Sequence, residues 1–153
     1  MKLLRIGKKG NEKPAAIDKD GKIRDISSHI QDLKPDHLNF DTISKLQIAD
    51  LTSLPELSSN ERIGSCITKP GKFVAIGLNF SDHAAETGAK PPTEPIVFMK
   101  ATSCINGPND DIEINKDSKK LDWEVELGVV IGKHTKHISE NQSQDHILGY
   151  CLV

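Results

Sequence analysis

Long hydrophobic runs, closely spaced cysteines and an excess of basic residues are all absent from this sequence of 153 residues. No apolar stretch approaches the roughly 20 residues that cross a bilayer, and the N-terminus lacks the apolar segment of a secretory signal. Cysteine occurs three times and never as Cys-x-x-Cys, which disfavours a zinc ribbon or a redox pair. The 20 basic and 22 acidic residues disfavour a dedicated nucleic-acid-binding protein. We therefore expect a cytoplasmic protein with reduced thiols that binds neither nucleic acid nor membrane.

Aromatic residues are scarce and unevenly distributed. Only six occur, and five of them follow residue 70, namely Phe73, Phe80, Phe98, Trp123 and Tyr150. A hydrophobic content of 36% with 27% charged residues is typical of a folded protein rather than a disordered one. The distribution leads us to expect the larger hydrophobic core in the second part of the chain.

The first part, residues 1–68, is expected to be a small β-rich accessory domain. Short apolar segments bounded by turn residues predict strands over 2–7, 14–17, 22–26 and 62–67. Capping residues predict short helices over 29–33 and 41–50. The turn residues Lys69-Pro70-Gly71 place the end of this domain near residue 68.

The second part, residues 69–153, has a different pattern. Strands are expected over 72–78, 96–102, 111–114, 122–132 and 149–153, and helical stretches over 81–87 and 139–147. Continuous apolar runs predict that the strands at 72–78 and 122–132 are buried. The chain stops inside the apolar run 149–153, where a buried strand would leave backbone groups unpaired. We therefore expect this chain to be a fragment of a longer protein.

Two acidic residues in Asp122-Trp123-Glu124-Val125-Glu126-Leu127 form a candidate metal site. Side chains alternate between the faces of a strand, so Glu124 and Glu126 share a face and can converge on one ion. Burying two carboxylates without compensation costs several kcal/mol each, and a hard cation such as Mg²⁺ or Mn²⁺ removes that cost. The alternative interpretation is the exposed polar face of an antiparallel strand.

A second candidate site lies in the helical stretch that follows the strand at 72–78. His83 and Glu86 are three residues apart and therefore neighbours on one helix face. A carboxylate beside an imidazole can orient it as a general base, although a solvated surface pair would have the same spacing. Lys100, at the end of the next strand, either meets an anionic substrate or points into water.

Taken together, these segments resemble the fumarylacetoacetate hydrolase family. The resemblance runs in order through 77–86, 94–100, 106–110, 122–132 and 149–153. It implies an α+β, mainly β fold: a small N-terminal β-rich domain, residues 1–68, followed by part of a mixed β-sandwich roll, residues 69–153. This second region would be the N-terminal portion of the catalytic domain.

The resemblance also implies roles for five residues. Glu124 and Glu126 match two ligands for Mg²⁺ or Mn²⁺, and the third family ligand would follow Val153. His83 and Glu86 match the catalytic dyad, and Lys100 matches a lysine that borders the active site. The expected assembly is a homodimer.

The activity implied by the resemblance is hydrolysis of a C–C bond in a small 2-oxo acid or diketo acid of the fumarylacetoacetate or acylpyruvate type. Two alternatives stay open. One is a lyase, isomerase or hydratase of the same family, such as ureidoglycolate lyase or an enzyme of sugar-acid metabolism. The other is a non-catalytic fragment or binding module.

Overall fold

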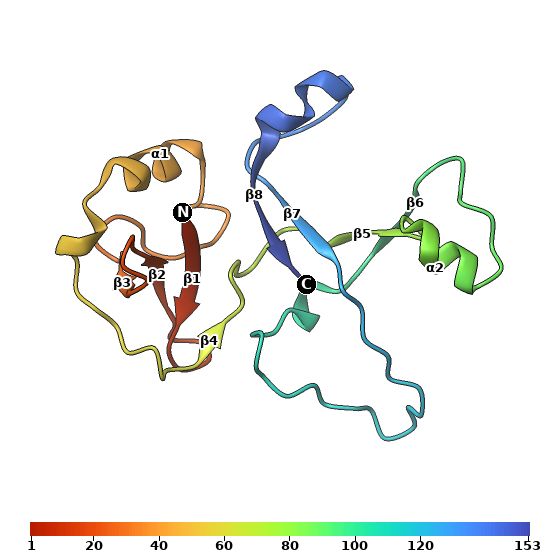
Figure 1. The fold of residues 1–153 in the computed structure, drawn as a ribbon, viewed down its shortest axis with the longest axis horizontal. Coiled ribbons are helices and arrows are strands. Elements are labelled where there is room, and N and C mark those ends of the chain that lie inside the picture. The colour runs from red at the N-terminus through yellow and green to blue at the C-terminus, as the bar shows by residue number, and fades with distance from the viewer. The chain divides into compact units, whose positions relative to one another are not determined.

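A computed structural model describes all residues from Met1 to Val153. The structure is mainly β with few helices (Figure 1). It divides into two compact units. One unit contains residues 1–68 and 106–153, and the other contains residues 69–105. No helix is both long enough and apolar enough to span a bilayer.

A four-stranded antiparallel sheet organises the N-terminal region. Its strands lie in the order β3-β2-β1-β4 and comprise β1 (Lys2–Ile6), β2 (Lys13–Ile17), β3 (Ile23–Asp25) and β4 (Ile63–Gly64). The β2–β3 turn is closed by Asp18, whose carboxylate accepts hydrogen bonds from the backbone N–H groups of Asp20 and Lys22. The four strands predicted in this region are confirmed, although β4 is shorter than expected.

Helix α1 (Phe40–Ile48) covers the main hydrophobic cluster of this unit. It begins at Asn39, whose side-chain oxygen accepts a hydrogen bond from the Thr42 N–H, as an N-cap does. A short 3₁₀ helix, η1 (Leu51–Ser53), follows it. The buried members of the cluster are Ala16, Ile26, Ile30, Leu33, Leu38 and Leu46.

The helix predicted over 29–33 is wrong, because that segment forms turns instead. The backbone N–H groups of His29 and Ile30 both donate to the Ile26 carbonyl, and the helical pattern does not continue. Pro35 disfavours helical geometry at the residue before it, which prevents the segment from extending into a longer helix.

The expectation that the larger core lies in the second part of the chain is also wrong. Every fully buried apolar residue except Ala84 lies within residues 1–68. The apolar side chains that follow are largely exposed, as shown by Trp123, which is 79% exposed. The physical reason is that the later strands form two-stranded ribbons, β5–β6 and β7–β8, and a ribbon buries a face only where another layer packs on it.

Strands β7 (Leu127–Ile131) and β8 (Ile147–Leu152) pair antiparallel, with a register shift at Val130/Ile131. The 3₁₀ helix η3 (Glu140–His146) connects them, and it starts with a capping box between Ser139 and Gln142. The predicted strand at 122–132 is therefore shorter than expected, and residues 122–126 have no regular secondary structure. The strand predicted at 111–114 does not form, because that segment has no partner strand to pair with.

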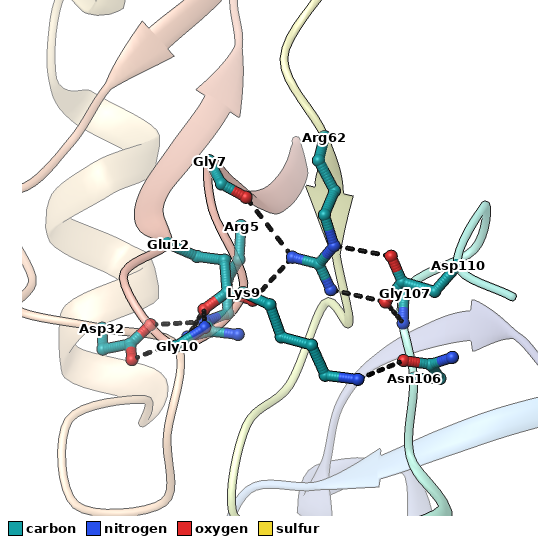
Figure 2. Close-up of polar contacts among 10 residues, drawn as sticks. All are labelled: Arg5, Gly7, Lys9, Gly10, Glu12, Asp32, Arg62, Asn106, Gly107 and Asp110. Atoms are coloured by element: carbon teal, nitrogen blue, oxygen red, sulfur yellow. Dashed lines mark hydrogen bonds and ion pairs between the residues drawn. The ribbon is translucent and has the colours of Figure 1, made fainter.

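A network of charged side chains joins residues 106–110 to the N-terminal sheet (Figure 2). Arg62 of the β4 segment forms two hydrogen bonds with the Asp110 carboxylate and a third, at 2.8 Å, with Glu12. Glu12 also pairs with the buried Arg5, which donates to Asp32 at 2.6 Å. Since most of these groups are shielded from water, each charge is compensated by a partner of opposite sign.

Close packing at Gly107 reinforces this connection. A Cβ atom at that position would lie 2.5 Å from the carbonyl oxygen of Ile63, closer than real Cβ atoms approach backbone. The Gly107 N–H in turn donates to the Asp110 carboxylate at 2.9 Å. The turn at 106–110 therefore needs glycine for its approach to β4.

Candidate functional site

The turn between β5 (Val74–Gly77) and helix α2 (Ser81–Glu86) carries the candidate catalytic pair. Leu78, in this turn, has a positive φ of 50°, a conformation that L-residues rarely adopt. Strain of this kind is often found at functional sites, where the surrounding structure maintains it. In α2 only Ala84 is buried, and its carbonyl accepts a hydrogen bond from the Ala89 N–H at 2.9 Å.

His83 and Glu86 lie on α2 and expose their side chains to solvent. The two side chains make no hydrogen bond to each other in this structure, so the orientation of the imidazole by the carboxylate stays a prediction. The three-residue spacing places both side chains on one helix face. Because both are exposed, a small molecule can reach them, and an accessible imidazole can accept a proton from water.

Lys100 directly follows β6 (Ile96–Met99), which pairs antiparallel with β5. Its backbone N–H donates to the Phe73 carbonyl at 2.9 Å, which extends the ribbon by one further pairing. The short 3₁₀ helix η2 (Thr102–Cys104) begins two residues later. Lys100 is half-buried and belongs, like His83 and Glu86, to the unit of residues 69–105.

Strands form within 72–78 and 96–102 as predicted, although β5 and β6 are shorter than these ranges. Helix α2 confirms the helix predicted over 81–87. The expectation that the first of these strands is buried is wrong. Val74 and Ile76 are 47% and 41% exposed, because no layer of the same unit covers that face of the ribbon.

Glu124 and Glu126 belong to the other unit and precede β7. Glu126 is held by two backbone hydrogen bonds with Val153, of 2.8 and 2.9 Å, which continue the β7–β8 pairing beyond the strands. The sequence predicted that both carboxylates would be buried and would therefore need a cation. In the structure Glu124 is exposed and Glu126 is half-buried, so burial does not require a cation here.

The two carboxylates nonetheless fit a hard divalent cation in donor chemistry, because Mg²⁺ and Mn²⁺ prefer carboxylate oxygens. They are incomplete as a ligand set: no group of three or more His, Cys, Asp or Glu side chains comes together anywhere in the structure. The chain thus offers two oxygen donors on one extended segment.

Two further interactions involve residues that are remote in sequence. Arg62 hydrogen-bonds Asp110 and lowers the pKa of that carboxyl to about 2, with a contribution from the Gly107 N–H. Burial, followed by the charge and hydrogen bonding of Cys66, raises the pKa of the Cys151 thiol to about 11. Neither interaction could be predicted from the spacing of residues in the sequence. Hydrophobic periodicity indicates which face of an element a residue lies on, but it does not indicate which distant residue lies beside it.

Comparison with known proteins bears on all five candidate residues. The model of the family described as "Fumarylacetoacetate (FAA) hydrolase C-terminal" matches residues 72–153. This chain belongs to the fumarylacetoacetate hydrolase family. All five candidate residues fall within the matched region of this family member, and their individual roles stay predictions.

Relatives and solved structures agree with this assignment. Proteins named "Putative hydrolase" in Burkholderia ambifaria and Burkholderia multivorans are each 52% identical to the chain over 153 residues. The match covers 100% of this chain and 54% of each relative, so the chain spans about half the length of these curated relatives. A fumarylacetoacetate hydrolase from Exiguobacterium antarcticum is 25% identical with a TM-score of 0.76, over 99% of this chain and 54% of that one. The fold is therefore of the fumarylacetoacetate hydrolase type.

Proposed function

We propose that this chain is part of a divalent-metal-dependent hydrolase that cleaves a C–C bond in a small 2-oxo acid or diketo acid. The observation that carries the proposal is the family match over residues 72–153, which includes His83, Glu86, Lys100, Glu124 and Glu126 in one ordered series. The 52% identity to proteins named as hydrolases supports the same reaction class.

In the proposed reaction, His83 acts as the general base and Glu86 orients its imidazole. His83 removes a proton from water, and the resulting hydroxide attacks one carbonyl carbon of the substrate. The C–C bond to that carbon then breaks, and the departing carbon takes up a proton. One water is consumed, and the products are a carboxylic acid and a smaller oxo acid. The exposed position of both side chains on α2 is compatible with access by water and substrate.

Lys100 is proposed to bind the substrate carboxylate, because an ammonium group pairs with an anionic oxo acid. Glu124 and Glu126 are proposed to hold Mg²⁺ or Mn²⁺ through carboxylate oxygens. When bound, such an ion supplies Lewis-acid polarisation of a carbonyl group. Since the chain offers two carboxylates rather than three, a further ligand from outside this chain belongs to the proposal.

The finer architecture is part of the same proposal. Residues 1–68 would be an accessory domain and residues 69–153 the N-terminal portion of a mixed β-sandwich roll. The whole protein would be a homodimer.

Product analysis of the whole protein tests the reaction. With Mg²⁺ and an acylpyruvate, we expect equal amounts of pyruvate and the carboxylic acid, with oxygen from isotopically labelled water in the new carboxylate. A panel of other oxo acids tests the family alternative. Conversion without C–C cleavage, or cleavage without incorporation of water oxygen, would replace the hydrolase with an isomerase, a hydratase or a lyase.

The third hypothesis is a non-catalytic fragment, and metal binding by this chain tests it. Two carboxylates on one segment are expected to bind Mg²⁺ only weakly, because the cation favours six oxygen ligands in octahedral geometry. Isothermal titration of the 153-residue chain with MgCl₂ is therefore expected to show no micromolar site. Tight binding that is lost in Glu126→Gln would show that the chain alone forms a working metal site.

A further inference from the structure

One face of the β7–β8 ribbon is apolar and open to solvent. In the antiparallel register Leu127 is opposite Leu152. Val129 is opposite Tyr150 two positions further along, so these four side chains share one face. Ile131 continues the same alternation along β7. All five side chains are exposed, from 47% for Val129 to 83% for Leu152, and none of them is charged.

The opposite face of the ribbon is partly closed. Gly128 is paired there with Cys151, and Val130 is paired with Gly149. All four residues are half-buried, and a Cβ atom at Gly128 would lie 2.6 Å from the Cys151 Sγ. The two faces of the ribbon therefore differ in exposure, and the more exposed face is the more apolar one.

The ribbon is anchored to the N-terminal core near the β7–β8 connection. Leu148 of β8 is partly buried against the main hydrophobic cluster. A Cβ atom at Gly132 would lie 2.8 Å from both Leu148 and the Phe40 ring, and the Lys133 ammonium lies 4.9 Å from the centroid of that ring. The apolar face is thus presented by a ribbon that is fixed in place.

The composition of this face is that of an internal surface. An antiparallel sheet that leaves one face in water usually carries polar residues on that face. Here the outward positions are aliphatic, with one aromatic ring at Tyr150. A contiguous exposed apolar patch of this kind marks a surface that another layer covers.

The source of that layer follows from the length of the family members. The chain spans about half the length of its curated relatives, so nearly half of the family length lies outside it. A segment of the same polypeptide meets the face at an effective concentration of the order of millimolar. A second copy of the chain would instead lose translational and rotational freedom on association. The whole protein itself is therefore the favoured source of the cover.

We propose that the remaining length of the whole protein packs an apolar β-layer on this face of the β7–β8 ribbon. Two sheets pack face to face about 10 Å apart with interdigitated apolar side chains, which fits the uncharged outward positions of β7 and β8. The inference rests on the proposed β-sandwich architecture of residues 69–153 and names the surface that completes it. It is independent of the proposed reaction.

Such a layer would leave one candidate metal ligand uncovered. Glu126 pairs with Val153 through two backbone hydrogen bonds, which extend the β7–β8 register by one position. Because side chains alternate along a strand, the Glu126 carboxylate lies on the same face as Gly128, opposite to the apolar face. The layer would therefore hold this segment extended without covering the carboxylate.

Nitration by tetranitromethane tests the cover without any substitution. Tyr150 is the only tyrosine of the chain and is 56% exposed. We expect the tryptic peptide that contains Tyr150 to be nitrated in the 153-residue chain and to lose most of that modification in the whole protein. Equal nitration of Tyr150 in the two proteins would overturn the proposal.

A conservative substitution provides the second test. Val129→Thr keeps the shape of the side chain and its preference for a strand, but it adds a hydroxyl group. The urea midpoint should fall in the whole protein, where the hydroxyl would be buried, and stay unchanged in the 153-residue chain. Ile48→Thr, at a position on α1 that is 87% exposed, is the matched control and should change neither midpoint. A whole protein that tolerates both substitutions equally would contradict the proposed cover.

Sedimentation velocity of the 153-residue chain tests the competing occupant, which is a second copy. We expect a monomer in which Tyr150 is nitrated. A discrete dimer in which Tyr150 is protected would assign the face to self-association and overturn the proposal. Neither result depends on turnover of a substrate, so failure of this inference is distinguishable from failure of the proposed reaction.

Discussion

Truncation of Leu46 to alanine should destabilise the chain strongly, because Leu46 is at the centre of its main core. The side chain is 1% exposed and packs from α1 among five other buried apolar residues. Comparable Leu→Ala substitutions cost about 3–5 kcal/mol, combining lost transfer free energy with the cavity that remains. Because small domains are stable by only about 5–15 kcal/mol, this change should remove a large fraction of the free energy of unfolding.

Urea denaturation followed by far-UV circular dichroism measures the effect. Tryptophan fluorescence is a poor probe here, because Trp123 is 79% exposed and lies outside the core. The matched control is Leu127→Ala in β7, where the same side chain is 59% exposed and the expected change is within about 0.5 kcal/mol. A loss below about 1 kcal/mol for Leu46→Ala, or a larger loss for Leu127→Ala, would refute the location of the core.

Three other substitutions test the contacts of the first unit. Gly107→Ala should cost about 1–3 kcal/mol in urea denaturation, because its Cβ would press on the Ile63 carbonyl oxygen. The hydrogen bonds from Arg62 lower the pKa of the Asp110 carboxyl from 3.8 to about 2. The stability that this pairing contributes is therefore present at pH values above 3.8 and is lost as the pH falls through about 2. Acid unfolding should therefore be less steep in Asp110→Asn across that range, and identical profiles would refute the pairing. Asn39→Ala should cost about 1 kcal/mol in thermal unfolding through loss of the α1 cap.

Local patterns predicted most of the secondary structure. Alternating apolar residues and turn signals located β1, β2 and β3, and α1 and α2 form where helices were expected, with Asn39 rather than the expected Asp41 as the N-cap of α1. Burial was not predictable in the same way. An apolar run such as 127–131 has the composition of a buried strand, but its burial depends on a second layer, and no such layer covers it in this structure.

The candidate site was predictable only in part. Residue types and spacing gave candidate residues but left a solvated alternative open for each of them. The resemblance to the family joined His83, Glu86, Lys100, Glu124 and Glu126 into one series, and the family match includes all of them. Contacts between remote residues were not predictable, because nothing in the local sequence relates Arg62 to Asp110. Packing of the turn at 106–110 against β4 brings these two side chains together.

The kcat of His83→Ala in the whole protein tests the central claim most directly. With Mg²⁺ and an acylpyruvate, loss of the general base should lower kcat by about a hundred- to ten-thousand-fold. Glu94→Gln, an exposed change in the same unit, should leave kcat unchanged. Unchanged kcat in His83→Ala, with the fold intact by circular dichroism, would contradict the proposed role of α2 in catalysis.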